Sequence, residues 1–413
     1  MRLSLLILAA LVVHLPRSSA AAAPERLVEE RVLPILAWIG PPAEQANVER
    51  YRELAECGFT HNFTGFPSAD AMARALDVAQ ETGVKVFVSC PELQSDPEGT
   101  AKRFRNHPAL AGYHLRDEPS AALFPELAAW VKRIRSVDAE HPCYINLFPN
   151  YADPAQLGTP TYREHVDQFI RQVPVQFVSF DHYPVVGRSL RDGFYENLEI
   201  VAAASRDAGK PFWAFSLAVA HGPYPVATTA HIRLQMYSNL AYGAQGLQYF
   251  TYWTVPSDTW NFHEAPILPD GRRGAVYARV QEVNRELQAR RGVFLGSTVE
   301  SVGHTGANIP HGTRPYHAAP PVQSLKTEGQ GAAVSILCKG DRRFLVAVNR
   351  DINAAMKLDV QLQDDAGVRI VKKDGTLGDA LGNAYRADVD PGDVVVLTWQ
   401  PQGRPICLSP HAP

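Results

Sequence analysis

Eight short apolar stretches alternate with eight amphipathic stretches between residues 33 and 292, and no other feature constrains the fold as strongly. The apolar stretches have the length of buried strands, and the amphipathic stretches carry apolar residues at helical spacing. Strict alternation of strands and helices implies parallel strands joined by right-handed crossovers. No G-x-G-x-x-G or P-loop pattern follows the first strand, which disfavours an open nucleotide-binding sheet. The sequence therefore predicts an α/β fold, a closed (β/α)8 or TIM barrel.

The composition divides the chain into four parts. Residues 1–20 form a leader, and residues 30–295 hold the barrel. The stretch 296–323 is rich in His, Pro and Gly, and it is predicted to be an irregular connector. Short alternating runs follow, and they predict a small antiparallel β-sandwich over residues 324–404. The predicted barrel strands are 33–39, 59–63, 85–90, 110–119, 143–147, 175–180, 212–220 and 247–253.

The leader has a positive start at Arg2, an apolar centre over 3–13 and a run of small residues over 16–23. This pattern is typical of a secretory signal peptide, too short for a spanning helix. We expect the mature protein to be secreted or periplasmic, with no membrane partner after cleavage. The formal net charge is −3, without a long basic run, so nucleic acid is not an expected partner. No oligomeric state follows from the sequence.

The fourth predicted strand ends in two adjacent acids, Asp117 and Glu118, followed by Pro119. Two acids at the end of a buried strand are costly to desolvate unless the protein uses them. The carboxyl ends of barrel strands are where (β/α)8 enzymes place their catalytic residues. We therefore predict that Glu118 is a proton donor. The alternative is that Glu118 caps the next helix or pairs with Arg116.

The same rule collects polar and aromatic residues from other strand ends at the barrel mouth. Acids and amides can bind the hydroxyls of a sugar, and aromatic rings can cover its C–H faces, so a carbohydrate is the expected ligand. Besides the acids, the predicted substrate-binding residues are Trp38, His61, Asn62, Asn146, His182, Tyr183, His221, Tyr252 and Trp253.

Glycoside cleavage needs a general acid and a second carboxylate. Burial and the neighbouring charge of Asp117 would raise the pKa of Glu118 toward neutrality. Asp181, at the end of the sixth strand, is the predicted second carboxylate. It would act as a nucleophile at a separation of about 5 Å, or as the base of an inverting reaction at about 6.5–9.5 Å. We expect a secreted glycoside hydrolase that cleaves an O-glycosidic bond of an oligo- or polysaccharide without a cofactor.

Asp117-Glu118-Pro119 and Tyr252-Trp253 resemble motifs of the clan of retaining glycosidases with (β/α)8 barrels, which includes β-galactosidases and cellulase-like enzymes. The resemblance covers residues 30–295 as architecture but only these few residues as motif. It implies that Glu118 is the acid/base and that Trp253 forms the floor of the subsite for the cleaved sugar.

The sequence departs from the clan at two places. Asp117 replaces the asparagine that binds the sugar 2-hydroxyl, and an aspartate can accept that hydrogen bond but not donate it. The predicted seventh strand, up to His221, contains no glutamate where the clan has its nucleophile. The clan's double displacement therefore does not carry over intact.

Two other functions stay open. The first is a carbohydrate-binding barrel without hydrolysis. The second is a metal-dependent sugar-active barrel enzyme, because the mouth residues include side chains that bind divalent ions. The barrel sequence has no H-x-H or H-x-x-x-H ligand pair, so no metal is predicted. The candidate ligands are His61, Asp117 or Glu118, Asp181, His182 and His221.

Overall fold

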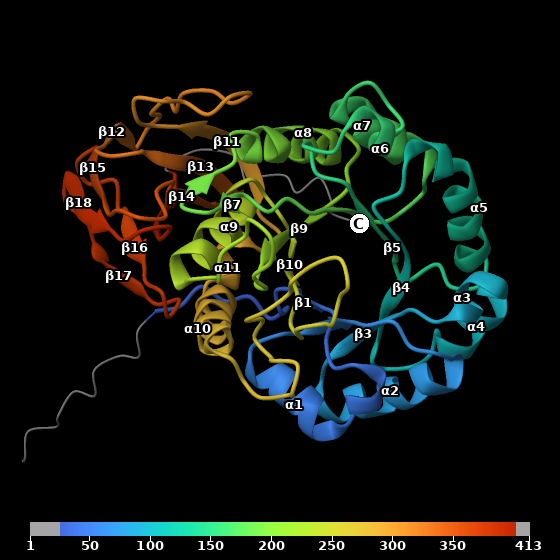
Figure 1. Cartoon of the computed structure of the whole chain (residues 1–413). Coiled ribbons are helices and arrows are strands. Elements are labelled where there is room, and N and C mark those ends of the chain that lie inside the picture. Colours follow the sequence, from blue (N-terminus) through green and yellow to red (C-terminus); the bar gives the residue numbers. More distant parts are fainter. Residues whose placement is uncertain (1–24, 402–413) are drawn as a thin grey trace, which may run out of the picture.

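The computed structural model describes residues 25–401, and the predicted signal peptide (1–20) lies outside the described residues. Eight parallel strands close into a barrel in the order β1-β10-β9-β6-β5-β4-β3-β2, with a β-rich domain beside it (Figure 1). The predicted fold class, a (β/α)8 barrel followed by a β-sandwich, is confirmed. The barrel strands are β1 Ile35–Trp38, β2 His61–Phe63, β3 Lys85–Val88, β4 Leu110–Asp117, β5 Cys143–Leu147, β6 Val178–Phe180, β9 Phe212–Leu217 and β10 Gly246–Phe250.

Helices surround the barrel, and local sequence signals set their ends. For α2, the Ser68 side chain accepts a hydrogen bond from the Ala71 N–H, and Gly83 ends the helix with left-handed backbone (φ 75°). The helices are α1 Val48–Glu56, α2 Ala69–Thr82, α3 Pro91–Ser95, α4 Pro97–Phe104, α5 Phe124–Arg135, α6 Pro154–Leu157, α7 Tyr162–Gln172, α8 Phe194–Asp207, α9 Thr229–Ala241, α10 Ala275–Ala289 and α11 Arg291–Phe294, with 3-10 turns η1 Ala43–Gln45 and η2 Ala121–Leu123. Among residues 25–401, none of these helices combines the length and the apolar character needed to cross a bilayer.

The C-terminal domain has a six-stranded sheet, β11-β13-β14-β19-β16-β17, and a three-stranded sheet, β12-β15-β18. An apolar core that includes Leu345 and Val360 holds the two sheets together. The stretch predicted as a connector is only partly irregular, because β11 lies within it and pairs with β13. The strands are β11 Thr298–His304, β12 Val322–Thr327, β13 Ala332–Lys339, β14 Arg342–Asn349, β15 Met356–Leu362, β16 Arg369–Val371, β17 Leu377–Ala380, β18 Ala384–Val389 and β19 Val394–Trp399.

The sandwich packs against the barrel helices α9 and α10. Arg290 follows α10, and its guanidinium donates to the carbonyls of Val371 and Lys372, both at 3.0 Å. On α9, Arg233 forms ion pairs with Glu286 of α10 and with Asp393 of the sandwich. These contacts fix the sandwich on one side of the barrel.

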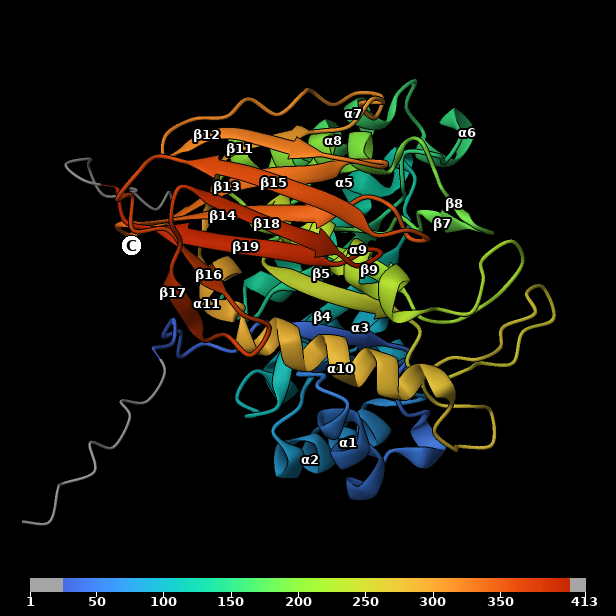
Figure 2. The same cartoon turned by 90° about the vertical axis from the view of Figure 1, so that its left-hand side faces the viewer.

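The loops that follow the strands form one end of the barrel. In Figure 2, a hairpin and the long loop after β10 project from the same end of the molecule, and this end is the mouth. The hairpin joins β7 Val185–Val186 to β8 Ser189–Leu190, and the sequence did not predict it. The mouth therefore has its tallest walls after β6 and β10.

Candidate active site

Strand β4 carries an irregularity that directs two acids to the mouth. Its register against β5 shifts by one residue between His114 and Arg116, so that Asp117 pairs with Asn146. Such a bulge reverses which of the later side chains face the barrel interior. The next residue, Glu118, has left-handed backbone (φ 43°), a conformation that persists in a non-glycine residue only where its surroundings enforce it. The Glu118 N–H donates to the carbonyl of Asn146 at 2.8 Å.

Asn146 is the centre of a hydrogen-bond network under the mouth. Its amide nitrogen donates to one carboxylate oxygen each of Asp117 and Asp181, both at 3.1 Å. Its amide oxygen accepts from the Ser179 hydroxyl at 2.8 Å, and Ser179 in turn accepts from Gln248 at 2.9 Å. The network joins β4, β5, β6 and β10, so the amide can present its two N–H bonds only to the two acids.

Asp117, Glu118 and Asp181, called here the acid cluster, differ in their access to solvent. Asp117 is exposed at the mouth, Glu118 is half-buried and Asp181 is buried. The carboxyl groups of Glu118 and Asp181 are hydrogen-bonded to each other. The alternative expectation for Glu118 was a helix cap or a pair with Arg116. The partner of the Glu118 carboxyl group is instead Asp181.

Burial is the main cause of the raised pKa values in the acid cluster. Burial first, and then the charge of Asp117, raise the pKa of Glu118 to about 7. The pKa of Asp181 lies well above its ordinary value because of burial and the charges of Glu118 and Asp117. Asp117 is exposed as a residue, but its carboxyl group is enclosed by the surrounding strand ends, and this desolvation raises its pKa against the hydrogen bond from Asn146 and the charge of Arg116. At neutral pH the Glu118–Asp181 pair therefore retains at least one proton.

The contact between Glu118 and Asp181 bears on the choice of the second carboxylate. The two carboxyl groups lie next to each other at the mouth. Asn146 bridges β4 and β6 and holds Asp117 and Asp181 at the same distance, 3.1 Å. The role of Asp181 as the second carboxylate, nucleophile or inverting base, stays a prediction.

The residues after β6 alternate between the barrel interior and its outer side. Ser179 and Asp181 face inward and reach Asn146. Tyr183 also faces inward and packs near Phe250. The His182 ring is buried, 5.3 Å from the ring of Phe194 on α8 and 5.0 Å from that of Tyr151, and neither of its ring nitrogens has a hydrogen-bond partner among residues 25–401. The role of His182 in substrate binding stays a prediction.

The aromatic wall faces the acid cluster across the mouth. Rings in contact connect Tyr183 with Phe250 at 5.6 Å and with Tyr224 at 6.0 Å. His221 continues the wall at 4.8 Å from Tyr224, and its ring lies 5.6 Å from Trp260, which is 48% exposed. The predicted mouth residues Tyr183 and His221 thus lie here. The wall consists of Tyr183, His221, Tyr224, Phe250 and Phe262.

Two predicted mouth residues lie deeper in the barrel. The Trp38 ring is 5% exposed and packs against Phe63 at 4.3 Å and Phe215 at 5.3 Å inside the barrel. His61 begins β2 instead of ending it, and its ring contacts Trp213 at 5.6 Å near the opposite end of the barrel. Both side chains belong to the packed interior of the barrel.

Three further predicted residues lie between the strands and the outer helices. The Asn62 amide donates to the Tyr51 hydroxyl on α1 at 3.1 Å. Tyr252 is fully buried, and its hydroxyl has no hydrogen-bond partner among residues 25–401. The guanidinium of Arg50 lies 5.4 Å from the centre of the Trp253 ring, on the side of α1. The Trp253 ring is 5% exposed, and its role as the floor of a sugar subsite stays a prediction.

Several residues of the mouth were not predicted from the sequence. Phe250 was overlooked because the strand-end rule selected the last aromatics of the run, whereas Gln248 and Phe250 are on the inward face. The two-residue period of the strand could have identified Phe250. Tyr151, Tyr224 and Trp260 lie on loops, and only their exposure or ring contacts reveal them.

Strand β9 ends without an acid, as the sequence indicated. Leu217 and Val219 occupy the inward positions and belong to the apolar cluster that contains Trp38 and Tyr183. Within residues 25–401, no group of three or more His, Cys, Asp or Glu residues has the geometry to hold a metal ion. The predicted ligand candidates are dispersed, since His61, His182 and His221 lie in three different environments.

Comparison with known proteins identifies the type of barrel. A family model described as β-galactosidase (family 42 of glycoside hydrolases) matches residues 129–290, less than half of the chain. A search of curated proteins finds no match to the sequence.

Solved structures extend the likeness to the whole fold. A family 42 β-galactosidase from G. stearothermophilus superposes with a TM-score of 0.60 at 10% identity, covering 92% of this chain and 100% of that chain. The β-galactosidase from Bacillus circulans sp. alkalophilus gives 0.59 at 9% identity, covering 89% and 99%. A family 39 glycoside hydrolase from Bacteroides cellulosilyticus gives 0.53 at 11% identity, covering 90% and 81%. At these identities the likeness concerns the fold, including the domain that follows the barrel.

Proposed function

We propose that this glycosidase, built on the (β/α)8 barrel that resembles the family 42 β-galactosidases, cleaves an O-glycosidic bond of an oligo- or polysaccharide with Glu118 as its general acid. The observation that supports this role is the hydrogen-bonded pair of Glu118 and Asp181 at the mouth. A general acid works best with a pKa near the operating pH, and the pKa of Glu118 is about 7.

The protonated form of Glu118 supplies the first step. Its carboxyl proton passes to the glycosidic oxygen while the bond from that oxygen to the anomeric carbon breaks, and Glu118 becomes a carboxylate. Asp181, more deeply buried, keeps its own proton and donates a hydrogen bond to that carboxylate. Asp181 is therefore a positioning residue that stabilises the product of the proton transfer.

Asp117 is the proposed second carboxylate. It is the one member of the acid cluster that is exposed at the mouth, and it lies on the same strand end as Glu118. Asn146 holds it from one side at 3.1 Å. In this proposal Asp117 acts on the anomeric carbon, directly or through a water molecule, because β9 provides no acid for this role.

The aromatic wall is the proposed binding surface for the sugar. Tyr151 and Trp260, 42% and 48% exposed, belong to the few large hydrophobic side chains that the described residues expose, and both stand at the rim of the mouth. An exposed ring at the rim can cover the C–H face of a sugar unit next to the cleaved bond. We further propose that the leader at residues 1–20 exports the enzyme to where such glycans occur.

The test is product release from a panel of aryl glycosides and plant or microbial glycans. Wild type is compared with Glu118→Gln and with Glu140→Gln, a control at an exposed glutamate before β5. We expect turnover by wild type and by the control, and a loss of about 10²–10⁴ in the Glu118 variant. Equal activity in all three proteins would remove Glu118 from the catalytic role. An inactive wild type across the panel would leave a carbohydrate-binding barrel as the better description.

A further inference from the structure

Arg191, directly after the β7–β8 hairpin, is held at the rim of the mouth by two tyrosines. Its guanidinium lies 4.3 Å from the centre of the Tyr151 ring and 5.7 Å from that of Tyr224. One terminal nitrogen donates to the Tyr224 hydroxyl at 3.0 Å. Stacking on planar rings and a fixed hydrogen bond restrict the side chain before any ligand arrives.

The tyrosines connect Arg191 to the acid cluster. Tyr224 belongs to the aromatic wall and contacts Tyr183. Tyr151 lies near both Tyr224 and Asp181, and the charges of these two residues contribute to raising the pKa of Tyr151. The guanidinium is therefore one side chain away from the groups proposed to cleave the sugar.

Arg191 is not paired with a carboxylate in the described part of the chain. Among residues 25–401, no acidic oxygen lies within 4 Å of its nitrogens, and its Nε is buried without a hydrogen-bond partner. The other arginine of the mouth, Arg116, is different, since its charge acts on Asp117 and lowers the pKa of that carboxyl. Charged groups that are partly buried are usually paired, so the missing partner of Arg191 points to a ligand.

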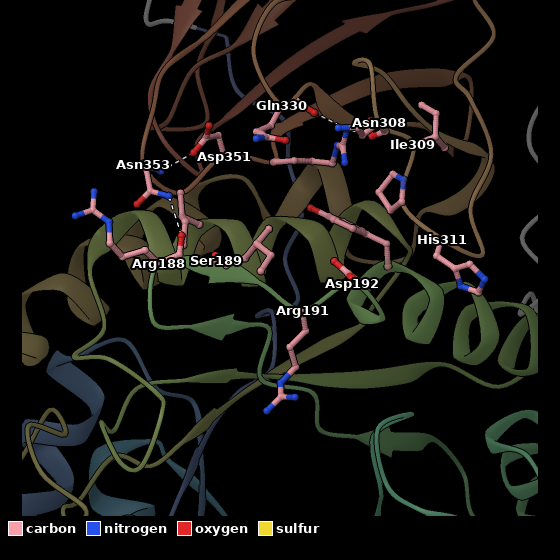
Figure 3. A pocket seen from close by; sticks show the side chains of 15 residues that line it. Arg188, Ser189, Arg191, Asp192, Asn308, Ile309, His311, Gln330, Asp351 and Asn353 are labelled. Atoms are coloured by element: carbon pink, nitrogen blue, oxygen red, sulfur yellow. Dashed lines mark hydrogen bonds between the residues drawn. The ribbon is translucent and has the colours of Figure 1, made fainter.

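The large pocket beside the hairpin does not account for Arg191. This cavity of about 510 Å³ lies between the hairpin and the sandwich, and Arg191 forms part of its lining. Figure 3 shows the Arg191 side chain directed away from Asn308 and Gln330, which line the opposite side. Its charged end therefore serves the mouth and not the pocket.

We propose that Arg191 makes the mouth selective for an acidic sugar, one that carries a carboxylate or a sulfate ester on the unit bound against the aromatic wall. Arginine presents two N–H bonds in a plane that matches either group. The raised pKa values in the acid cluster leave it partly protonated, which reduces repulsion of an anionic substrate at and below neutral pH. This inference rests on the proposed function, because it takes the mouth as the substrate site.

The test measures binding apart from turnover. Calorimetry gives dissociation constants for the methyl glycosides, in both anomers, of galactose, glucose and mannose. Each is compared with its C6-carboxylate and with its 6-sulfate. The proteins are wild type, Arg191→Gln, Arg191→Lys and Arg188→Gln. Arg188 is exposed on the same hairpin, and the Arg188 variant removes the same charge outside the mouth.

We expect wild type to bind at least one anionic sugar about 10- to 100-fold more tightly than its neutral counterpart, the range of a hydrogen bond between charged groups. Arg191→Gln should lose this preference and keep its affinity for the neutral sugar, Arg191→Lys should retain part of it, and Arg188→Gln should retain it fully. Whether the C6-carboxylate or the 6-sulfate binds more tightly shows which anionic group Arg191 recognises.

A wild type without anionic preference, or a preference that survives in Arg191→Gln, would overturn the inference. A loss of affinity for neutral and anionic sugars alike would also overturn it, because Arg191 would then only hold the tyrosines in place. Turnover of neutral aryl glycosides without any anionic preference would contradict the inference alone. Anionic preference without turnover of any substrate would contradict only the proposed hydrolysis.

Discussion

The two sides of the barrel mouth differ in chemistry. At the ends of β4, β5 and β6 the mouth is polar, and Asn146 links two members of the acid cluster. At the ends of β9 and β10 it is aromatic, with Phe250 and His221 in the wall and apolar Leu217 inside. The resemblance to the retaining glycosidases implies a nucleophile on the seventh barrel strand, but β9, the seventh strand here, ends without an acid. In this chain both proposed chemical steps therefore fall to the polar side, and the aromatic side is left to bind the sugar.

The two sides also differ in how their geometry is fixed. The acids are held by hydrogen bonds that cross three strands, so their positions follow from the barrel register. The wall depends on ring contacts between a strand end and two loops, as between Phe250 and Phe262 at 5.8 Å. Substitutions on the polar side should therefore change the rate, and substitutions on the aromatic side should change binding.

After the loss expected for Glu118→Gln, the largest effect should come from Asp181. Asp181→Ala removes the hydrogen bond to the Glu118 carboxylate that forms during proton transfer, and we expect kcat to fall by about 10²–10³. Asp181→Asn keeps an N–H donor at the same place and should stay within about tenfold of wild type. Steady-state kinetics measures both. Equal losses in the two variants would show that the charge of Asp181 matters and not its hydrogen bond.

An effect of intermediate size concerns stability. It tests whether the ionised carboxylate of Glu118 destabilises the folded protein. The pKa of Glu118 rises from an ordinary value near 4.5 to about 7 in the folded protein. A raised carboxyl pKa contributes stability below the unfolded value, and this contribution is lost as pH rises through the folded value. Glu118→Gln avoids the ionisation, so its free energy of unfolding should exceed that of wild type by about 1–3 kcal/mol at pH 8.

Urea denaturation at pH 8 and at pH 4 measures this difference. It should nearly vanish at pH 4, where Glu118 is protonated in both the folded and the unfolded protein. A variant less stable than wild type at pH 8 would contradict the raised pKa of Glu118.

The smallest effect should come from the rim of the aromatic side. Trp260→Ala removes an exposed ring and should raise KM about tenfold, the size of one aromatic contact, while kcat stays unchanged. Tyr252→Phe is the control, since Tyr252 is fully buried outside the barrel interior, and it should change neither constant. A fall in kcat for Trp260→Ala would contradict the division of labour between the two sides.

The sequence predicted the barrel, the sandwich and the strand end that carries Glu118, because hydrophobic periodicity reports directly on buried strands and helices. It could not predict which side chains near a strand end face inward. The bulge in β4 depends on the pairing with β5, and it alone places Asp117 opposite Asn146. Likewise, His61 was misplaced because its strand begins, and does not end, at that residue.

The contact between Glu118 and Asp181 also could not be predicted from the sequence. Both acids were recognised from their positions after apolar runs, but their distance depends on the closure of the barrel and on Asn146 as a bridge. Loop residues such as Tyr224 carry no periodic signal, so the partners of Arg191 could be found only in the folded chain.

The pH dependence of kcat/KM tests the central claim most directly, with one glycoside that has a poor leaving group and one that has a 2,4-dinitrophenolate. For the poor leaving group, the rate of wild type should fall above a pH of about 7, where Glu118 loses its proton. Glu118→Gln should lose this pH dependence, and should hydrolyse the dinitrophenyl glycoside nearly as fast as wild type, because that leaving group needs no proton. A limb near pH 7 that persists in Glu118→Gln, or equal losses on both substrates, would contradict the assignment of Glu118 as the general acid.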